Sequence, residues 1–371
     1  YHLLTTRLHE VAAGALPPAA AAVPLQAISG LRRVAVQIGR IIAIDPAAKR
    51  VTLADGTVLR ADALAIALGS RPADYGIPGL TEHALTLGSL ADALAVRAAV
   101  EALVARAAAG RRTRIVIGGG GVTGVQLAGE LAARWRQRAR RERIPAGALE
   151  IAVIEAGTRL MNGVHPALAG RAARILTSLG VGVRLRTRLS AVGPGWVSVE
   201  GSDGQRRHSC DAFVWTGGVQ ANPLIGRSLR TDPQGRALVD ETLQAVAAPG
   251  VFVLGDNARA VRLGEARPVP PTAQAAVEQA ELVAYNLAAL AAGDDGRMRP
   301  YRGRQKGFVV SVGPAVAVGM LGAGAVRGSG RAWHALKRWI EHTYLRTLGI
   351  GPGWMALWEG SSFPWSDRSS A

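Results

Sequence analysis

Three glycines have the spacing of a nucleotide-binding turn. Gly119, Gly121 and Gly124 come directly after a predicted strand, 112–118, and open a long predicted helix. In such a unit the first glycine makes the tight turn, the second lets a pyrophosphate approach the backbone, and the third lets the helix pack closely on the strand. The helix N-terminus then attracts phosphate through its free N–H groups and partial positive charge. The pattern predicts a dinucleotide-binding turn, to which Thr123 also belongs.

Glu155 is the candidate for recognising the ribose of the same nucleotide. It ends the predicted strand 149–155, about thirty residues after the turn because the intervening helix is long. A carboxylate at this strand end can accept hydrogen bonds from both ribose hydroxyls and would repel a 2′-phosphate. Glu155 therefore favours NADH over NADPH; the alternative is a chance acidic residue on a surface turn.

A second predicted strand, 251–254, ends on the pair Gly255-Asp256. Ligands of open α/β sheets bind at the carboxyl ends of the strands. There, the Asp256 carboxylate can hold a ribityl hydroxyl of a flavin, and Gly255 lets the chain approach it. The alternative interpretation is an ordinary strand-end aspartate that caps the next segment.

The predicted elements around these residues can position both sites. Residues 31–70 are predicted to form a β-meander that closes at Gly69. A helix over 88–109 precedes the glycine turn, and the β-turn-α-β order that follows is that of a mononucleotide-binding half. A further strand ends near Gly217, and a second long helix is expected over 271–291.

Composition limits the class of protein. The chain has 371 residues, of which 49% are hydrophobic and 19% charged, enough for two or three domains with their own cores. Its single cysteine, Cys210, excludes an intrachain disulfide, a cysteine metal cluster and a dithiol centre within the residues shown, and fits a reducing compartment. No run approaches the roughly 18 to 20 apolar residues of a membrane-spanning helix. The net charge of +17 is mostly arginine spread along the chain, and it fits either nucleic acid or an anionic membrane until local context decides.

The ordered motifs resemble the two-dinucleotide-domain flavoproteins, and within them the type II, single-subunit NADH dehydrogenases. The resemblance extends from residue 1 to about residue 350. In order along the chain, HLLTTRLHEVAAG is similar to their segment after the first acidic strand, and IVIGGGGVTGVQLAGEL is similar to their NADH turn. VWTGGVQANPL resembles the strand at the end of their NADH domain. VFVLGDNA resembles their second flavin motif, and PPTAQAAVEQA resembles the start of their helix beneath the isoalloxazine.

This resemblance implies an FAD-dependent enzyme that transfers hydride from NADH to flavin and electrons on to a membrane quinone, without proton pumping. The implied fold is α/β, with two Rossmann-like dinucleotide-binding domains and a C-terminal amphipathic helical module. We expect an FAD domain over 1–85 and 220–308, an NADH domain over 86–219, and a membrane-association module over 309–371. The discontinuous FAD domain is expected to be N-terminally incomplete, because no FAD glycine turn precedes the one at 119; an unusual natural start is the alternative.

Two departures from the family pattern lie near the implied reaction centre. Gln126 stands where relatives usually carry glutamate, two residues after the third glycine. The quinone-site pattern, Ala-Gln with a second glutamine four positions later, occurs here as Ala273-Gln274 with Glu278, and Gln279 comes next. Because the cofactor carries the chemistry, Gln126, Gln274 and Glu278 are residues to test rather than established catalysts; Glu278 on a solvated helix face is the alternative. The remaining predicted cofactor contacts are Gly69, Gly217 and Ala273.

The C-terminal region suggests where the acceptor lies. The segment 331–346 repeats apolar residues at helical spacing, with basic residues on its flanks. The apolar residues are Trp333, Leu336, Trp339, Ile340 and Tyr344, and the basic ones are Arg331, Lys337, Arg338 and Arg346. Such a helix is typical of a membrane interface, and the predicted location is peripheral, on the cytoplasmic face of a bacterial inner membrane. The alternative is a helix that covers the core or a partner in a homodimer.

Some features of the sequence bear on other classes of protein. The arginine run 134–143 is interpreted as the solvated face of a helix, and no nucleic acid partner is expected. A soluble NAD(P)H oxidoreductase with a protein or other acceptor, and a truncated, non-catalytic NADH-binding protein, stay open. A sulfide:quinone or dithiol reductase is disfavoured because Cys210 stands alone in the residues shown.

Overall fold

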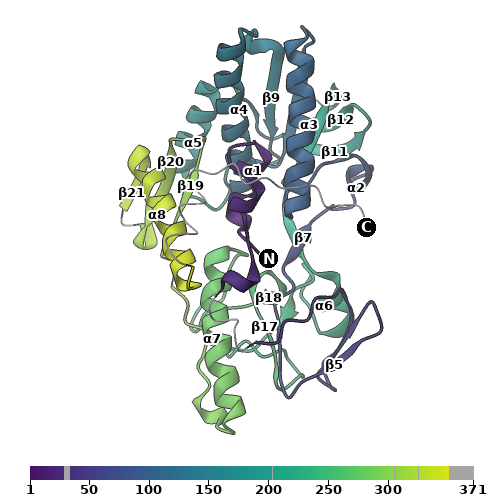
Figure 1. Ribbon diagram of the computed structural model, residues 1–371, viewed down its shortest axis with the longest axis vertical. Coiled ribbons are helices and arrows are strands. Elements are labelled where there is room, and N and C mark those ends of the chain that lie inside the picture. Colours follow the sequence, from purple (N-terminus) through teal and green to yellow (C-terminus); the bar gives the residue numbers. More distant parts are fainter. Residues whose placement is uncertain (29–33, 203, 305, 325, 351–371) are drawn as a thin grey trace. The chain divides into compact units, whose positions relative to one another are not determined.

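The computed structural model describes residues 1–28, 34–202, 204–304, 306–324 and 326–350, which divide into two compact units (Figure 1). Unit 1 comprises Tyr1–Ala35, Asp74–Gly218 and Lys306–Ala371, and unit 2 comprises Val36–Ala73 and Val219–Gln305. Three tryptophans of the predicted C-terminal module, Trp354, Trp358 and Trp365, lie outside the described residues.

Unit 1 is built on a parallel sheet of four strands in the order β10-β9-β8-β14. The strands are β8 (Thr113–Gly118), β9 (Leu149–Ile154), β10 (Gly182–Arg184) and β14 (Ala212–Trp215), and the helices packed along them are α3 (Leu90–Ala108), α4 (Val122–Glu142) and α5 (Pro166–Ser178) (Figure 1). A parallel sheet is covered on both faces, so its strands are almost continuously apolar; accordingly Ile115 and Ile117 are fully buried. The predicted β-turn-α-β order and the α/β fold class are confirmed.

The other elements of unit 1 surround this sheet. They are β1 (His2–Leu3), α1 (Leu8–Ala12), β2 (Ala22–Val23), α2 (Leu80–His83), the antiparallel sheet of β11 (Arg188–Gly193), β12 (Trp196–Gly201) and β13 (Gly204–Ser209), a second antiparallel sheet of β19 (Gly307–Ser311), β20 (Ala317–Leu321) and β21 (Val326–Gly330), and α8 (Arg331–Thr347). Helix α1 contacts both α3 and α4, and α8 lies against β19, β20 and β21 (Figure 1).

The predicted C-terminal helix is confirmed as α8, but two of its residues do not have the predicted role. The Trp333 indole lies against β20 and β21, where Gly319 and Gly328 leave no room for a Cβ. Lys337 is only 6% exposed, so it is not part of a basic flank in solvent. The three strands before α8 were not expected, because the glycine-rich segment 307–330 has weak alternation of apolar and polar residues.

Unit 2 contains a second long helix and a β-meander over 41–60, which is shorter than the predicted 31–70: residues 34–40 form no strand, and 31–33 lie outside the described residues. Its elements are β3 (Ile41–Asp45), β4 (Arg50–Leu53), β5 (Val58–Arg60), β6 (Leu64–Ile66), β7 (Ser70–Pro72), β15 (Val219–Ala221), α6 (Pro223–Ser228), β16 (Ala237–Leu238), β17 (Val251–Val253), β18 (Ala258–Arg259) and α7 (Ala273–Ala291). Strands β3, β4 and β5 form the antiparallel meander, and β17 pairs in parallel with β6. The Thr272 hydroxyl accepts a hydrogen bond from the Ala275 N–H and so caps α7.

The two units do not coincide with the nucleotide domains expected from the sequence. Unit 1 includes the first 35 residues and the segment from Lys306 onward together with 74–218. The units are defined by packing, whereas the expected domains are defined by the cofactor each would bind. The domain boundaries therefore stay a prediction. Among the helices of the described residues, none combines the length and apolar character that crossing a membrane requires.

Candidate functional site

Of the three glycines in the motif of unit 1, two have no room for a side chain and the third faces open space. Gly119 has φ +101°, and a Cβ there would lie 2.6 Å from the Gly217 Cα. A Cβ at Gly124 would collide with the carbonyl oxygen of Gly119. At Gly121, which caps the N-terminus of α4, a Cβ would meet no atom within 4 Å. The turn is thus closely packed on one side and open beside Gly121.

Thr216 locks this turn in place. Its Oγ1 lies 3.0 Å from the carbonyl oxygens of both Gly118 and Gly119, and can donate to either. Thr216 was not identified from the sequence, although it directly precedes the predicted Gly217. Thr123, the second residue of α4, is exposed beside the same opening.

Glu155 lies next to the turn, as predicted. Its Oε2 accepts a hydrogen bond of 2.7 Å from the Gly120 N–H, and its Oε1 accepts one of 2.7 Å from the Gly157 N–H. A carboxylate has about four acceptor positions, so each oxygen keeps capacity for a further donor. The side chain therefore holds the loop and can still receive ribose hydroxyls.

Gln126 is turned into the interior of unit 1. Its side chain is buried, and its Nε2 donates to the Ser311 Oγ on β19 over 3.1 Å. This partner was not visible from the sequence because 185 residues separate the two side chains. The expected place of Gln126 near the nicotinamide stays a prediction.

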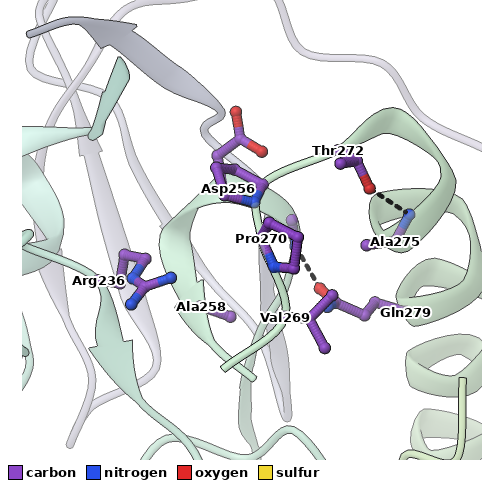
Figure 2. Close-up of a pocket in the computed structure, with 10 residues that line it drawn as sticks. Arg236, Asp256, Ala258, Val269, Pro270, Thr272, Ala275 and Gln279 are labelled. Atoms are coloured by element: carbon purple, nitrogen blue, oxygen red, sulfur yellow. Dashed lines mark hydrogen bonds between the residues drawn. The ribbon is translucent and has the colours of Figure 1, made fainter. Parts of the chain in front are cut away.

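The second predicted site lies in unit 2, where β17 meets the N-terminus of α7. Gly255 (φ +66°) opens a short 3₁₀ turn, and its N–H donates to the Gln279 Oε1 over 2.7 Å. Figure 2 shows Gln279 reaching from α7 toward this turn, while the Asp256 carboxylate points away from it. The Asp256 Oδ2 accepts a hydrogen bond of 2.6 Å from Ser70, which directly follows the exposed Gly69.

Glu278 and Gln279 are neighbours in the sequence but face different sides of α7. Gln279 faces the Gly255 turn, so it supports the strand end. Glu278 lies one turn after Gln274, whose Nε2 donates to the Glu278 Oε1 over 3.3 Å and to the Arg304 carbonyl oxygen over 2.7 Å. Glu278 therefore lies on the same helix face as Gln274, and Ala273 is the first residue of the helix.

Glu278 also lines a pocket of about 480 Å³ in unit 2. The other lining residues are Leu282, Arg299, Pro300, Tyr301, Arg302 and Gly303. Tyr301 is almost fully buried, and desolvation raises the pKa of its hydroxyl. The pocket has an apolar wall with one carboxylate and two guanidinium groups, which suits a ligand with an apolar body and polar ends.

The residues present fit the two implied cofactors. The open space beside Gly121 at a helix N-terminus is the shape that a pyrophosphate requires. In unit 2, Gly69 and Gly255 are both left-handed, a Cβ at Gly69 would meet no atom within 4 Å, and the Asp256 carboxylate is partly exposed. These two features support a dinucleotide in unit 1 and a flavin in unit 2.

A parallel α/β sheet with a dinucleotide turn, together with a glycine-acid strand end, defines a nucleotide-dependent oxidoreductase. The chain belongs to the pyridine nucleotide-disulphide oxidoreductase family, whose sequence profile matches residues 7–280. The family name refers to a disulphide, but Cys210 is the single cysteine of the 371 residues, and it is buried.

Individual relatives confirm the resemblance stated from the motifs. The chain is 28% identical over 357 residues to the type II NADH:quinone oxidoreductase of Staphylococcus aureus (strain NCTC 8325 / PS 47), covering 95% of this chain and 88% of the relative. The Staphylococcus epidermidis protein of the same name is 28% identical over 354 residues, covering 94% and 87%.

Solved structures support the fold. NDH2 from Plasmodium falciparum in complex with NADH superposes with a TM-score of 0.79 at 16% identity, covering 93% of this chain and 87% of that one. The sulfide:quinone oxidoreductase of Aquifex aeolicus gives a TM-score of 0.76 at 16% identity, covering 93% and 82%.

Proposed function

We propose that this protein is a type II NADH:quinone oxidoreductase, which passes electrons from NADH through FAD to a membrane quinone without pumping protons. The observation that carries the proposal is the glycine turn of unit 1, open beside Gly121 and flanked by Glu155. The names of the relatives, at 28% identity over nearly the whole chain, support the same activity.

The residues of unit 1 bind and orient NADH. The N-terminus of α4 receives the pyrophosphate, and the free acceptor capacity of Glu155 receives the hydroxyls of the adenosine ribose. A 2′-phosphate would meet the Glu155 carboxylate, which is fixed by Gly120 and Gly157. This arrangement favours NADH over NADPH.

The residues of unit 2 hold the flavin and line the pocket of the electron acceptor. When bound, the flavin accepts hydride from NADH and passes electrons onward. Asp256 holds a ribityl hydroxyl, with its carboxylate oriented by Ser70. Gln274 and Glu278 form a hydrogen-bonded pair on one face of α7, and the Glu278 carboxyl can hold a proton at the pocket that we assign to the quinone.

Replacing Glu278 tests the acceptor assignment. Glu278→Ala should lower the rate of quinone reduction while NADH-driven flavin reduction stays nearly intact, because Glu278 contributes nothing to the nucleotide turn. Glu281→Ala, an exposed position on the same helix, is the matched control. Equal loss of both half-reactions in Glu278→Ala would count against the assignment.

The exposed face of α8 supports a peripheral membrane location, on the cytoplasmic face of a bacterial inner membrane. Trp339 is 64% exposed and Ile340 is 43% exposed, and Arg331 and Arg346 are exposed on the same helix. Such side chains partition into the interface of anionic lipid. Trp339→Ser should weaken binding to anionic vesicles, whereas Ala335→Ser on the same helix should not. Equal vesicle binding by both variants, or rapid turnover with soluble acceptors alone, would favour a soluble NAD(P)H oxidoreductase.

A further inference from the structure

A cluster of polar side chains is buried inside unit 1, where α1, α4, β19 and α8 meet. It serves neither the nucleotide turn nor the flavin strand end. Its members are Arg7, His9, Glu10, Gln126, Glu130, Ser311, Lys337 and Glu341. Burying charged groups is costly unless each is paired. The charges in this cluster therefore indicate which of its groups carry a proton.

In the neutral half of the cluster, the side chains of Gln126, Ser311 and His9 are joined by hydrogen bonds. The Gln126 Nε2 donates to the Ser311 Oγ, and this hydroxyl lies 3.2 Å from the His9 Nε2. Burial, followed by the charges of Lys337 and Arg7, holds the pKa of His9 well below its usual range, and the ring also hydrogen-bonds to the backbone of Thr6. His9 is therefore neutral, and its Nε2 accepts the Ser311 hydroxyl proton.

In the charged half of the cluster, three carboxylates face two cationic side chains. Arg7 donates to the Glu341 Oε2 from Nη2 over 2.8 Å and from Nε over 3.1 Å. The Lys337 Nζ lies 3.0 Å from the Glu341 Oε1 and 4.0 Å from the Glu10 Oε1. Glu130, only 1% exposed, is the third carboxylate beside these two cations. With all three ionised, a negative charge stays uncompensated in the interior.

Among the described residues, three carboxylate oxygens of the cluster lack a hydrogen bond, and the Glu341 Oε1 has the Lys337 ammonium as an ion-pair partner. Within the described residues, neither the Glu10 Oε2 nor the Glu130 Oε2 finds a hydrogen-bond donor. Ligand atoms of His9, Glu10 and Glu130 all lie within 4.8 Å of one another. An O–H on one carboxyl would supply the donor for the other.

We propose that Glu10 and Glu130 share a proton at and below neutral pH, and that this proton completes the network that fixes α8 to α1 and α4. It removes the surplus charge and satisfies both orphaned oxygens. Desolvation, followed by the charge of Glu10, raises the pKa of Glu130 from 4.5 to about 7. The pKa of Glu10 is also raised, primarily by desolvation.

The other charged groups around Glu10 and Glu130 do not compensate the excess negative charge. Arg134 on α4 is exposed, and Arg338 on α8 only partly offsets the rise in the pKa of Glu10. Burial and the charges of Lys337 and Arg338 lower the pKa of His334, so this imidazole adds no positive charge at neutral pH.

A metal ion fits the same place less well than a proton. Within the described residues, His9, Glu10 and Glu130 offer one ligand atom each, and the His9 Nε2 already accepts the Ser311 hydroxyl. The Lys337 ammonium lies beside Glu10 and would repel a cation. A proton needs no further ligands and is not excluded by this neighbour.

The shared proton makes the attachment of α8 dependent on pH. A carboxyl whose pKa is raised in the folded state stabilises that state fully below its unfolded pKa, and this contribution is lost as pH rises through the folded pKa. The window is therefore pH 4.5 to about 7. Because α8 carries the exposed Trp339 and Ile340, the pair would link pH to the helix proposed for membrane contact. Only this link rests on the proposed function.

Hydrogen exchange of the α8 amides tests the proposal in the intact chain. After correction for intrinsic exchange, the opening constant of α8 should rise by up to about tenfold per pH unit between pH 5 and 7 and level off above pH 7. Glu130→Gln should flatten this dependence, because an amide donates to Glu10 at every pH. Glu142→Gln, near the exposed end of α4, should behave as wild type.

Three outcomes would overturn the proposal. The first is equal pH dependence in wild type and Glu130→Gln. The second is a stoichiometric divalent metal whose removal by EDTA loosens α8. If Glu130→Gln does not fold, infrared spectroscopy of the wild type decides: a buried carboxylic acid band should be present at pH 6 and fade above pH 7, and its absence at pH 6 is the third outcome. None of these readouts depends on NADH or quinone turnover.

Discussion

The glycine turn can be divided experimentally into a structural part and a ligand-binding part. Gly119→Ala and Gly121→Ala add the same methyl group two residues apart. At Gly119 the methyl enters a backbone with φ +101° and would lie 2.6 Å from the Gly217 Cα. At Gly121 it enters open space at the N-terminus of α4. The first change should therefore damage folding, and the second should damage NADH binding.

The magnitudes follow from these two environments. A side chain at the φ of Gly119 costs about 1–3 kcal/mol, and forcing a methyl into packed backbone costs about 1–3 kcal/mol more. A total of about 4 kcal/mol is a large part of the roughly 5–15 kcal/mol that stabilises a domain. Gly121→Ala should cost under about 1 kcal/mol of folding, the difference between glycine and alanine at a helix N-cap. Its methyl would occupy the pyrophosphate space and lower NADH affinity about 10- to 100-fold, or about 1.4–2.8 kcal/mol.

Thermal unfolding and NADH titration of both variants measure these effects. Gly147→Ala is the matched control, because a Cβ there also meets no atom within 4 Å but the position lies away from the glycine turn. Wild-type NADH affinity in Gly121→Ala, or a wild-type unfolding temperature in Gly119→Ala, would contradict these two roles.

Three further predictions concern single side chains. Glu155→Gln turns an amide NH₂ toward a backbone N–H, since both carboxylate oxygens accept from the loop. Titrations should show weaker NADH binding and a smaller preference for NADH over NADPH. An unchanged ratio of the two affinities would contradict the assignment. Asp256→Ala removes the acceptor proposed for a ribityl hydroxyl and should weaken FAD binding by about tenfold or more, measured from flavin absorbance after dialysis; full retention of flavin would argue against this role. Burial, followed by the charge of Asp211, raises the pKa of the Cys210 thiol to about 11, so iodoacetamide should label it slowly at pH 8 until the protein is unfolded; rapid labelling of the native protein would show that the thiol is accessible.

Local features were predictable from the sequence. The glycine turn, its strand and its helix are encoded in a continuous stretch, and the position of Glu155 follows from the next strand end. The phase of α7 was also accessible, because positions 274 and 278 share a helix face whereas 279 lies on the next one. The structure shows this as the separate partners of Glu278 and Gln279.

Contacts between distant segments were not predictable in the same way. The His9–Ser311 and Arg7–Glu341 pairs join residues 302 and 334 positions apart. Lys337 has the spacing of a basic flank on a membrane helix, yet it is buried beside Glu10 and Glu341. Periodicity gives the angle of a side chain around its helix, but the neighbouring element decides whether a charge on that side meets solvent or a buried partner.

Flavin absorbance in an anaerobic stopped-flow experiment reports electron transfer from NADH through the flavin to a quinone. The purified chain, loaded with FAD, is mixed first with NADH and then with a quinone. We expect NADH to bleach the flavin rapidly and quinone to restore the oxidised spectrum. NADH binding without bleaching would indicate a non-catalytic nucleotide-binding protein, and a bleached flavin that only soluble acceptors reoxidise would contradict the quinone assignment.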